Sequence, residues 1–418
     1  MSKPDHGPLH AYMLALAAHF AAGGMMSVVF PWIIVHELHE TQARVGIAQA
    51  IASLPMMLLI LVGGAAADGR DLRSYLARLQ LGTAMIPITL ALVIALHQLS
   101  FTSATVCLFA MGIVAAFVMP ARDSLLSYVS PPSLGLARTS ALAVAATFGG
   151  QLVGTGIAAS ASAVGAVPLL CGQAMLLAAS AVLTARLKME NPHAPKPGEP
   201  TKFARLWPEM REGFKIVWHN ERLRTITLYF VLSGPLFNGM FLVGLPLMVR
   251  DVYHGQSAML SGLLTAFLLG LTVSSFAISR MRQSERPGRL MMLVTLNNVI
   301  IFTASYFAPP FPVFVVLIFL WGVIGGVGMA TSRGLVQASA PHAYRARVLS
   351  ILQFANVSGG PPGALLYGFT SQAIGIQNTL LFVPVAVMVL WLSFRFFTRL
   401  WEFRREDHIH EASVSAAP

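Results

Sequence analysis

The sequence predicts an all-α polytopic membrane protein with twelve transmembrane helices in two pseudo-symmetric bundles of six. The chain of 418 residues is 56% hydrophobic and 11% charged, whereas a soluble chain carries about 25% charged residues. Its long apolar runs approach twenty residues, which matches a hydrocarbon core of about 30 Å. These runs are continuous rather than alternating, and the backbone must satisfy its own hydrogen bonds in lipid, so helices are expected instead of barrel strands.

Charges and turn residues divide the apolar sequence into twelve spans. They are expected near 10–36, 43–67, 75–97, 101–121, 136–160, 165–187, 224–250, 257–280, 288–308, 312–333, 345–371 and 376–399. The alternative for the fourth span is that it runs on to about Tyr128, with Arg122 at the membrane interface. Between the sixth and the seventh lies the longest connection, which opens with the proline-rich stretch "NPHAPKPGEP". The predicted organisation is therefore a six-helix bundle over 1–187, a cytoplasmic linker over 188–223, a second bundle over 224–400 and a tail over 401–418.

The linker is expected to hold an amphipathic helix on the membrane surface. Its apolar residues follow helical spacing on one face. They are Phe203, Trp207, Met210, Phe214 and Val217.

The orientation follows from the positions of the basic residues. With the N-terminus in the cytoplasm, the cytoplasmic loops and tails hold all 28 Lys and Arg residues except Arg44 and Arg250. This asymmetry is the positive-inside pattern, so both termini are expected in the cytoplasm of a bacterial inner-membrane protein. Because these basic residues serve topology, the net charge of +11 does not predict a nucleic-acid partner.

The two halves of the chain repeat each other weakly. When the sequence is compared with itself at a separation of 210 residues, Gly149 and Gly150 align with the glycine pair 359–360. At a separation of 211 residues Arg122 aligns with the arginine at 333, and at 215 residues Pro31 aligns with Pro246. Such an internal repeat is typical of transporters built from two equivalent helix bundles.

Three stretches give the chain a family resemblance. "GGAAADGRDLRS" is similar to the G-x-x-x-D-R-x-[GD]-R-R loop of the major facilitator superfamily, "PARDSLLSYVSPPSLGLARTSAL" to its segment after helix four, and "MREGFKIVWHNERLR" with "RARVLSILQ" to its central loop and start of helix eleven. Within that superfamily the chain resembles the branch that holds the enterobactin exporter and the macrolide efflux proteins. The resemblance implies alternating access between two bundles and a proton-coupled exporter of a small amphipathic compound, a siderophore or a drug.

The resemblance also implies a cytoplasmic gate. Asp68, at the end of helix two, is expected to hold the positively polarised N-terminus of helix eleven when that gate is closed. The remaining gating candidates are charged residues of the same loop and of the ends of helices four, ten and eleven. They are Arg70, Asp71, Arg73, Arg122, Arg333 and Arg347.

The substrate and proton sites are expected on helices that line the cavity in this superfamily. No Asp or Glu lies deep within a predicted span, and His19 is the ionisable side chain placed well inside the membrane, which marks it as a coupling candidate. A neutral histidine bonded between helices is the alternative. Substrate contact or, alternatively, helix packing is expected of amides and aromatics: Gln49, Phe148, Gln151, Phe237, Asn238, Gln353 and Asn356. With Phe148 and Phe237, the rings of Phe20, Phe30 and Phe241 are expected either to form an aromatic wall of the cavity or to pack between helices.

Two small-residue pairs are expected to permit close helix packing. They are Gly150 with Gly154, and Gly359 with Gly363.

The remaining motifs argue against other classes. There is no ATP-binding loop, nucleophile elbow or zinc spacing, so neither enzyme activity, nor a metal, nor a cofactor other than the proton gradient is expected. A small-molecule substrate, membrane lipids and a monomeric state are expected. An uptake carrier of the same fold and a non-transporting membrane sensor remain the alternatives.

Overall fold

The computed structural model describes residues 7–67, 70–131, 135–187, 202–280, 284–340 and 344–403. The chain divides into two compact units. Unit 1 comprises residues 1–207 and 255–262, and unit 2 comprises residues 208–254 and 263–418. The described residues form helices and no strand, which confirms the predicted fold class.

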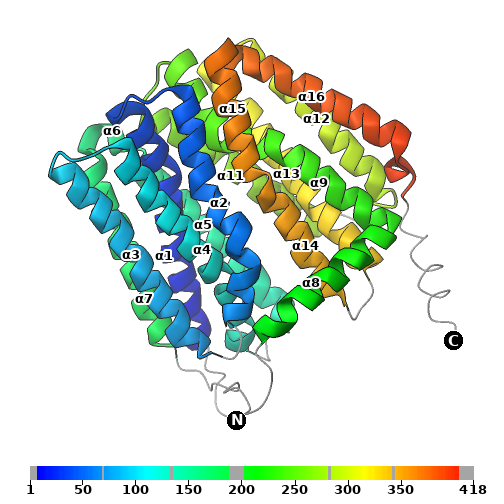
Figure 1. The fold of residues 1–418 in the computed structure, drawn as a ribbon, viewed down its shortest axis with the longest axis horizontal. Coiled ribbons are helices and arrows are strands. Elements are labelled where there is room, and N and C mark those ends of the chain that lie inside the picture. The colour runs from blue at the N-terminus through cyan, green and yellow to red at the C-terminus, as the bar shows by residue number, and fades with distance from the viewer. Residues whose placement is uncertain are drawn as a thin grey trace. The chain divides into compact units, whose positions relative to one another are not determined.

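Unit 1 consists of long helices that pack along their lengths (Figure 1). In chain order they are α1 (Gly7–Trp32), the π-helical turn η1 (Ile33–Glu37), α2 (Gln42–Ala67), α3 (Leu72–Ala95), α4 (Phe101–Val129), α5 (Gly135–Ala158), α6 (Ala161–Val164) and α7 (Ala166–Ala185). Helix α1 packs against α5 and α7, α2 against α4, and α3 against α4 and α7.

Unit 2 begins within α8 (Lys202–His219). Its further elements are α9 (Glu221–Gly239), η2 (Met240–Gly244), α10 (Leu245–Leu247), η3 (Met248–Val252), α11 (Ser257–Arg280), α12 (Pro287–Tyr306), α13 (Phe311–Ser339), α14 (Arg345–Ser358), α15 (Gly360–Ile374), α16 (Ile376–Phe397) and η5 (Leu400–Glu402). Helix α9 packs against α14 and α15, and α12 packs against α13 and α16. The first residues of α11 belong to unit 1.

Eleven helices in the described chain are long and apolar enough to cross a membrane. The remaining predicted span, 345–371, corresponds to α14 and α15, each of which is shorter. Only Gly359 separates them, and its backbone is itself helical (φ −71°, ψ −16°). Pro361 and Pro362 lack the amide hydrogens that would continue the hydrogen-bond ladder, and the bond from Gly363 N to Gly359 O resumes it at 3.0 Å. The interruption is therefore a proline effect inside one predicted span.

Left-handed backbone positions recur at the separations seen in the sequence repeat. Among the described residues, His39 (φ 49°) has its counterpart in His254 (φ 48°), His97 (φ 55°) in Ala308 (φ 45°), and Gly165 (φ 80°) in Gly375 (φ 83°). The members of these pairs are 215, 211 and 210 residues apart in the numbering. The agreement means that three interhelical turns are built alike in the two halves of the chain.

The repeat extends to two π-helical turns. Ile33–Glu37 begins two residues after Pro31, and Met248–Val252 begins two residues after Pro246. A proline removes one backbone donor from the helical hydrogen-bond ladder, and a π-helical turn follows each of these two aligned prolines. The aligned prolines thus reshape both first helices at corresponding places.

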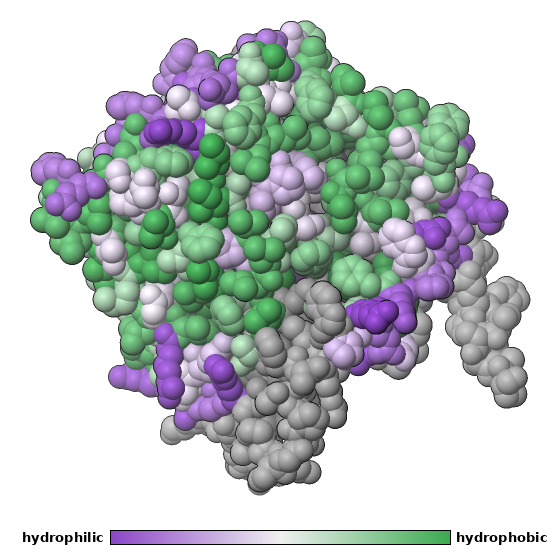
Figure 2. All heavy atoms as spheres, in the orientation of Figure 1, coloured by the Kyte–Doolittle hydropathy of each residue, from purple (hydrophilic) through white to green (hydrophobic). Residues whose placement is uncertain are grey.

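The lateral surfaces of the helices are apolar. Figure 2 shows hydrophobic residues along the helices, with hydrophilic residues gathered toward helix ends. Large side chains such as Leu14 (61% exposed), Ile300 (62%) and Met175 (68%) face outward. An apolar surface of this extent requires lipid around it, so the chain is a multi-pass membrane protein.

Helix α8 divides its apolar residues between two directions. Val217 is buried in a core cluster with Leu223, Val348 and Ile351, whereas Phe214 is 42% exposed. Trp218, which the sequence pattern did not include, is 60% exposed. The side chains of the predicted stripe at 203 and 207 lie outside the described residues. The helix is thus partly an element of the unit 2 core and not solely a surface helix.

Candidate transport and gating residues

His19 lies on α1 beside an aromatic ring and a cation. The imidazole meets Phe20 edge-on, with ring centroids 5.6 Å apart, and the Arg122 guanidinium of α4 lies 4.7 Å from the centre of the same ring. The His19 Nδ1 atom is buried, with no hydrogen-bond partner in the described chain. A buried polar atom without a partner is costly and uncommon, so this nitrogen stands out as an unsatisfied acceptor among the described residues.

Arg122 is held by several contacts within unit 1. Its side chain is 12% exposed and pairs with Asp123 at 2.8 Å, and its backbone carbonyl accepts a hydrogen bond from the Tyr12 hydroxyl at 2.9 Å. The fourth helix continues to Val129, so Arg122 lies within α4 rather than after it. Its predicted counterpart, Arg333 on α13, is exposed.

The charged loop between α2 and α3 organises the start of α3. Asp71 caps this helix, accepting hydrogen bonds from the Arg73 amide at 3.2 Å and the Ser74 hydroxyl at 2.5 Å. The Arg73 guanidinium donates to the Leu187 carbonyl just beyond α7 at 3.1 Å, where a cation complements the helix dipole. Arg70 lies 4.9 Å from the Tyr75 ring centre. Asp68, the principal gating candidate, lies outside the described residues.

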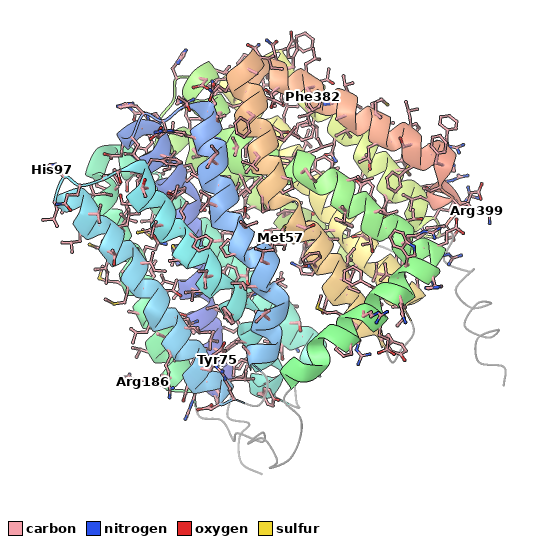
Figure 3. The ribbon with its side chains drawn as sticks, in the orientation of Figure 1. Met57, Tyr75, His97, Arg186, Phe382 and Arg399 are labelled. Atoms are coloured by element: carbon pink, nitrogen blue, oxygen red, sulfur yellow. The ribbon has the colours of Figure 1, made fainter. Side chains whose placement is uncertain are left out.

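Figure 3 locates this loop within unit 1. Tyr75 and Arg186 are labelled at one end of the helices, and His97 is labelled at the other. Asp71 and Arg73 therefore hold α3 at the same end as Arg186. The positive-inside pattern predicts that this end is cytoplasmic.

Arg347 joins the start of α14 to the linker helix. Its guanidinium pairs with Glu212 of α8 at 2.6 Å and lies 5.5 Å from the Tyr344 ring centre. A hydrogen bond to the Glu212 carboxylate raises the pKa of the Tyr344 phenol. The predicted gating residue thus ties two elements of unit 2 together.

The polar candidates of unit 2 lie between α9 and α14. The Asn238 amide donates to the carbonyl oxygens of Gly234 at 3.1 Å and Asn356 at 3.2 Å. Gln353, one turn earlier on α14, is half-buried. The Asn238 side-chain nitrogen therefore links two helices. The side-chain oxygen is the atom that remains to accept a hydrogen bond from a ligand.

A continuous series of aromatic rings crosses the interior of unit 2. Phe237 stacks on Phe302 at 6.1 Å between centroids, Phe302 meets Trp321 at 5.5 Å, Trp321 meets Phe267 at 4.7 Å, and Phe267 meets Phe241 at 5.2 Å. Phe302 and Trp321 are buried, while the other three rings are half-buried. Phe237 and Phe241 were predicted from the sequence, whereas their three partners were not, because the contacts join helices that are far apart in the chain.

The unit 1 amide and aromatic candidates are dispersed. Gln49 is 8% exposed, and Phe148 and Gln151 are half-buried on α5. Gln173 on α7 was not predicted from the sequence. It is 1% exposed, and its two side-chain polar atoms find no partner among the described residues. An amide within the apolar stretch "LLCGQAMLL" was the signal that could have identified it.

The glycine pairs lie at close helix contacts. A Cβ on Gly150 or Gly154 would overlap the carbonyl oxygens of Ala17 and Ala21 on α1. In unit 2, a Cβ on Gly359 would overlap the Gly234 backbone, and one on Gly363 the Pro235 carbonyl oxygen. These residues set the α1–α5 and α9–α15 contacts, where only small side chains fit.

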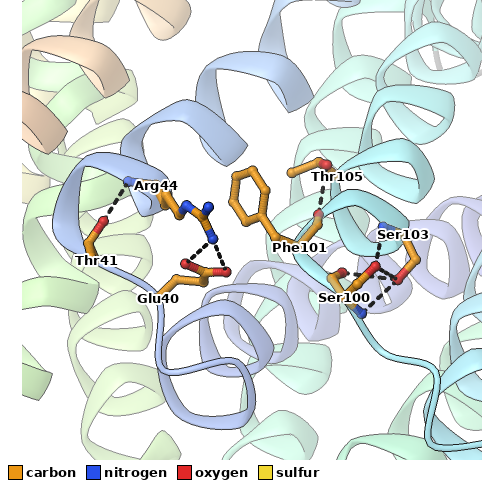
Figure 4. A network of polar contacts seen from close by, with 7 residues as sticks. All are labelled: Glu40, Thr41, Arg44, Ser100, Phe101, Ser103 and Thr105. Atoms are coloured by element: carbon orange, nitrogen blue, oxygen red, sulfur yellow. Dashed lines mark hydrogen bonds and ion pairs between the residues drawn. The ribbon is translucent and has the colours of Figure 1, made fainter.

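Arg44 and Arg250, the two basic residues that the charge pattern does not place in the cytoplasm, each pair with a nearby acidic residue. Arg44 binds Glu40 at 3.0 Å and lies 5.2 Å from the Phe101 ring centre, beside the Ser100–Ser103 capping box of α4 (Figure 4). Arg250 pairs with Asp251 in η3. Each of these two cations thus has an acidic partner close in the sequence.

The comparisons with known proteins agree with this architecture. Residues 12–364 and 236–413 match the Major Facilitator Superfamily. The chain is 26% identical over 414 residues to the multidrug efflux pump Tap of Mycolicibacterium fortuitum, covering 96% of this chain and 98% of the relative. It is 23% identical over 379 residues to the enterobactin exporter EntS of Citrobacter koseri, covering 87% and 85%.

Solved structures share the fold at low sequence identity. The nucleoside transporter NupG has a TM-score of 0.76 at 15% identity, covering 95% of this chain and 100% of that one. A bacterial homologue of the human lysosomal transporter Spinster has a TM-score of 0.70 at 14% identity, covering 96% and 98%.

The helical spans, the repeated turns and the apolar lateral surface define a multi-pass membrane protein with two similar halves, and the family match and the transporter relatives indicate a transporter rather than an enzyme. The chain belongs to the Major Facilitator Superfamily, whose matching regions together span most of its length. The family resemblance drawn from the sequence is confirmed.

Proposed function

We propose that this protein is a proton-driven exporter of a small amphipathic organic compound, a drug or a siderophore, working by alternating access. The aromatic series of unit 2 is the observation that carries this proposal. Its half-buried rings offer apolar and π surface, and Asn238, next to Phe237, offers an amide oxygen. Sites for amphipathic compounds combine such apolar walls with a few polar groups. The names of the relatives Tap and EntS support the same class of substrate.

The polar groups proposed to contact substrate are amides rather than carboxylates. Gln49, Gln151 and Gln353 join Asn238 and Asn356 in this role, and Phe148 joins the aromatic side chains. Amides donate and accept hydrogen bonds without fixing a charge. This chemistry favours compounds recognised by shape and aromatic contact, and it speaks against an importer of strongly charged solutes.

A compound panel tests the export function. Cells that overproduce the protein are expected to accumulate less of an exported compound and to tolerate more of it than cells lacking it. Increased accumulation on overproduction would establish the alternative, an uptake carrier. No change for any compound, with the protein present in the membrane, would favour a non-transporting sensor.

We place the protein in a bacterial inner membrane as a monomer among lipids, with both termini in the cytoplasm. Reporter fusions at 197 and 417 are expected to give cytoplasmic signals, because inverting the chain would move nearly all its basic residues across the membrane. A fusion at His97, in a connection assigned to the other side, is the control. A periplasmic signal at either of the first two sites would overturn this topology.

The proposed cytoplasmic gate centres on Asp68, aided by the charged residues of its loop and by Arg122, Arg333 and Arg347. Asp68→Asn is expected to lower transport at normal protein level, since a helix-terminal charge contributes about 0.3–2 kcal/mol. Asp71→Asn, which also weakens the cap of α3, is expected to lower thermal stability as well as transport. Wild-type transport by Asp68→Asn would contradict the gating role.

A further inference from the structure

A polar pocket opens at one end of unit 2. It has a volume of about 370 Å³, within the range of small-molecule sites, and is lined by residues of the α8–α9 junction and of the segment after α16. The lining residues are His219, Asn220, Glu221, Arg222, Arg399, Glu402 and Phe403. None of the transport candidates named above belongs to it, so it is separate from the proposed substrate site.

The pocket presents both signs of charge. Arg222 and Arg399 supply guanidinium groups, and Glu221 and Glu402 supply carboxylates. No described group of His, Cys, Asp or Glu side chains is arranged to hold a metal ion. A ligand that complements this lining carries an anionic and a cationic group within a few bond lengths.

The local structure fixes part of this lining. The Asn220 side-chain oxygen caps α9: it accepts hydrogen bonds from the backbone amides of Arg222 and Leu223 at 3.0 and 3.1 Å. The His219 Nδ1 donates to the Lys215 carbonyl at 2.7 Å, which leaves Nε2 for another partner. The Arg222 guanidinium lies 5.3 Å from the centre of the Phe403 ring. These contacts hold His219, Asn220 and Arg222 in place before any ligand binds.

The pocket lies at the level of the lipid headgroups. A candidate span begins at Glu221, and another ends at Phe397, so the lining residues sit where both helices leave the hydrocarbon. Beside it, Phe396 is 72% and Phe397 88% exposed. Arg289, at the start of the α12 span, and Arg395 both approach the Trp401 ring, with guanidinium carbons 5.2 and 5.3 Å from its centre. Aromatic and basic side chains gather in this way at membrane interfaces.

We propose that the pocket binds the phosphoethanolamine headgroup of a membrane lipid. Arg222 and Arg399 bind the phosphate, as arginine does in charge-assisted pairs, and His219 adds a ring nitrogen. Glu221 and Glu402 accept hydrogen bonds from the ammonium group. The acyl chains run along the exposed rings of Phe396 and Phe397.

Native mass spectrometry of the delipidated full-length protein tests the proposal. Phosphatidylethanolamine is expected to bind about tenfold more tightly than phosphatidylglycerol or phosphatidylcholine with the same acyl chains. Phosphatidylglycerol lacks the ammonium group from which the two carboxylates accept hydrogen bonds. Phosphatidylcholine has a quaternary nitrogen, which carries no N–H donor.

The variants separate the two halves of the headgroup. Glu402→Gln is expected to remove most of the preference over phosphatidylglycerol, and Arg399→Gln to weaken both lipids about tenfold. Glu285→Gln and Arg286→Gln, at exposed positions before α12, are the charge-matched controls and should retain wild-type binding. Melting temperatures confirm that each variant is folded.

Three results would overturn the proposal. One is equal binding of the three lipids by the wild-type protein, and another is an equal loss of preference in Glu402→Gln and Glu285→Gln. The third is binding of soluble glycerophosphoethanolamine as tightly as the whole lipid, which would assign the pocket to a free metabolite.

Discussion

Gly154→Ala is expected to destabilise the purified protein and to abolish transport, whereas Gly156→Ala, two residues further along α5, leaves both near wild-type values. A methyl group on Gly154 would overlap the backbone of Ala21 on α1, while the same group on Gly156 meets nothing within 4 Å. Backbone overlap is not relieved by a rotamer change, so the two helices must separate. Overpacking of this kind costs about 1–3 kcal/mol.

The control variant carries its own expectation. Alanine is favoured over glycine within a helix by about 0.5–1 kcal/mol, so Gly156→Ala should hold or slightly raise the melting temperature. The measurement is thermal unfolding in detergent, followed by transport in reconstituted vesicles. Equal melting temperatures for the two variants would show that the α1–α5 contact does not depend on a glycine at 154.

The spans were predictable because lipid imposes a length and a composition on each of them. The predicted range 43–67 agrees with α2 to within a residue, and the range 376–399 differs from α16 by two residues at its C-terminal end. The C-terminal end of the fourth span was harder to predict. Arg122 interrupts the apolar run, but its guanidinium is satisfied by Asp123 and the Phe20 ring, so the helix continues to Val129.

The π-turns illustrate what a linear pattern omits. Pro31 and Pro246 were visible as aligned prolines, and their effect on the ladder two residues later was not. For α8, helical spacing identified the helix, but spacing cannot tell which apolar residues find a protein partner. Val217 is buried in a core cluster of unit 2, whereas Phe214 is 42% exposed.

The candidate site was predictable in its residue types and less so in its connections. Chemistry singled out His19, because an ionisable side chain in lipid is expensive. It also selected Asn238, whose contact with the Asn356 carbonyl bridges α9 and α14. The bond from Arg73 to the Leu187 carbonyl joins residues 114 positions apart, and a backbone acceptor leaves no mark in the sequence. Trp321 was not predicted because its contacts with the Phe267 and Phe302 rings join helices that are far apart in the chain.

His19→Gln is expected to abolish efflux driven by a pH gradient while leaving substrate binding and counterflow intact. We propose that this histidine carries the coupled proton. Its Nδ1 is buried without a partner in the described chain, so taking up and releasing a proton there breaks no hydrogen bond with the protein. Glutamine keeps a polar side chain of similar size but does not titrate, which separates proton transfer from packing.

The decisive measurement uses purified protein in vesicles with an imposed pH step. His10→Gln, at an exposed position of the same helix, is the control and should concentrate substrate as the wild type does. Counterflow exchanges substrate without net proton movement, so its survival in His19→Gln shows an intact carrier. If His19→Gln still concentrates substrate against its gradient, the proton moves through another group. The carboxylates of Asp68, Glu37 and Asp251 are then the next groups to substitute.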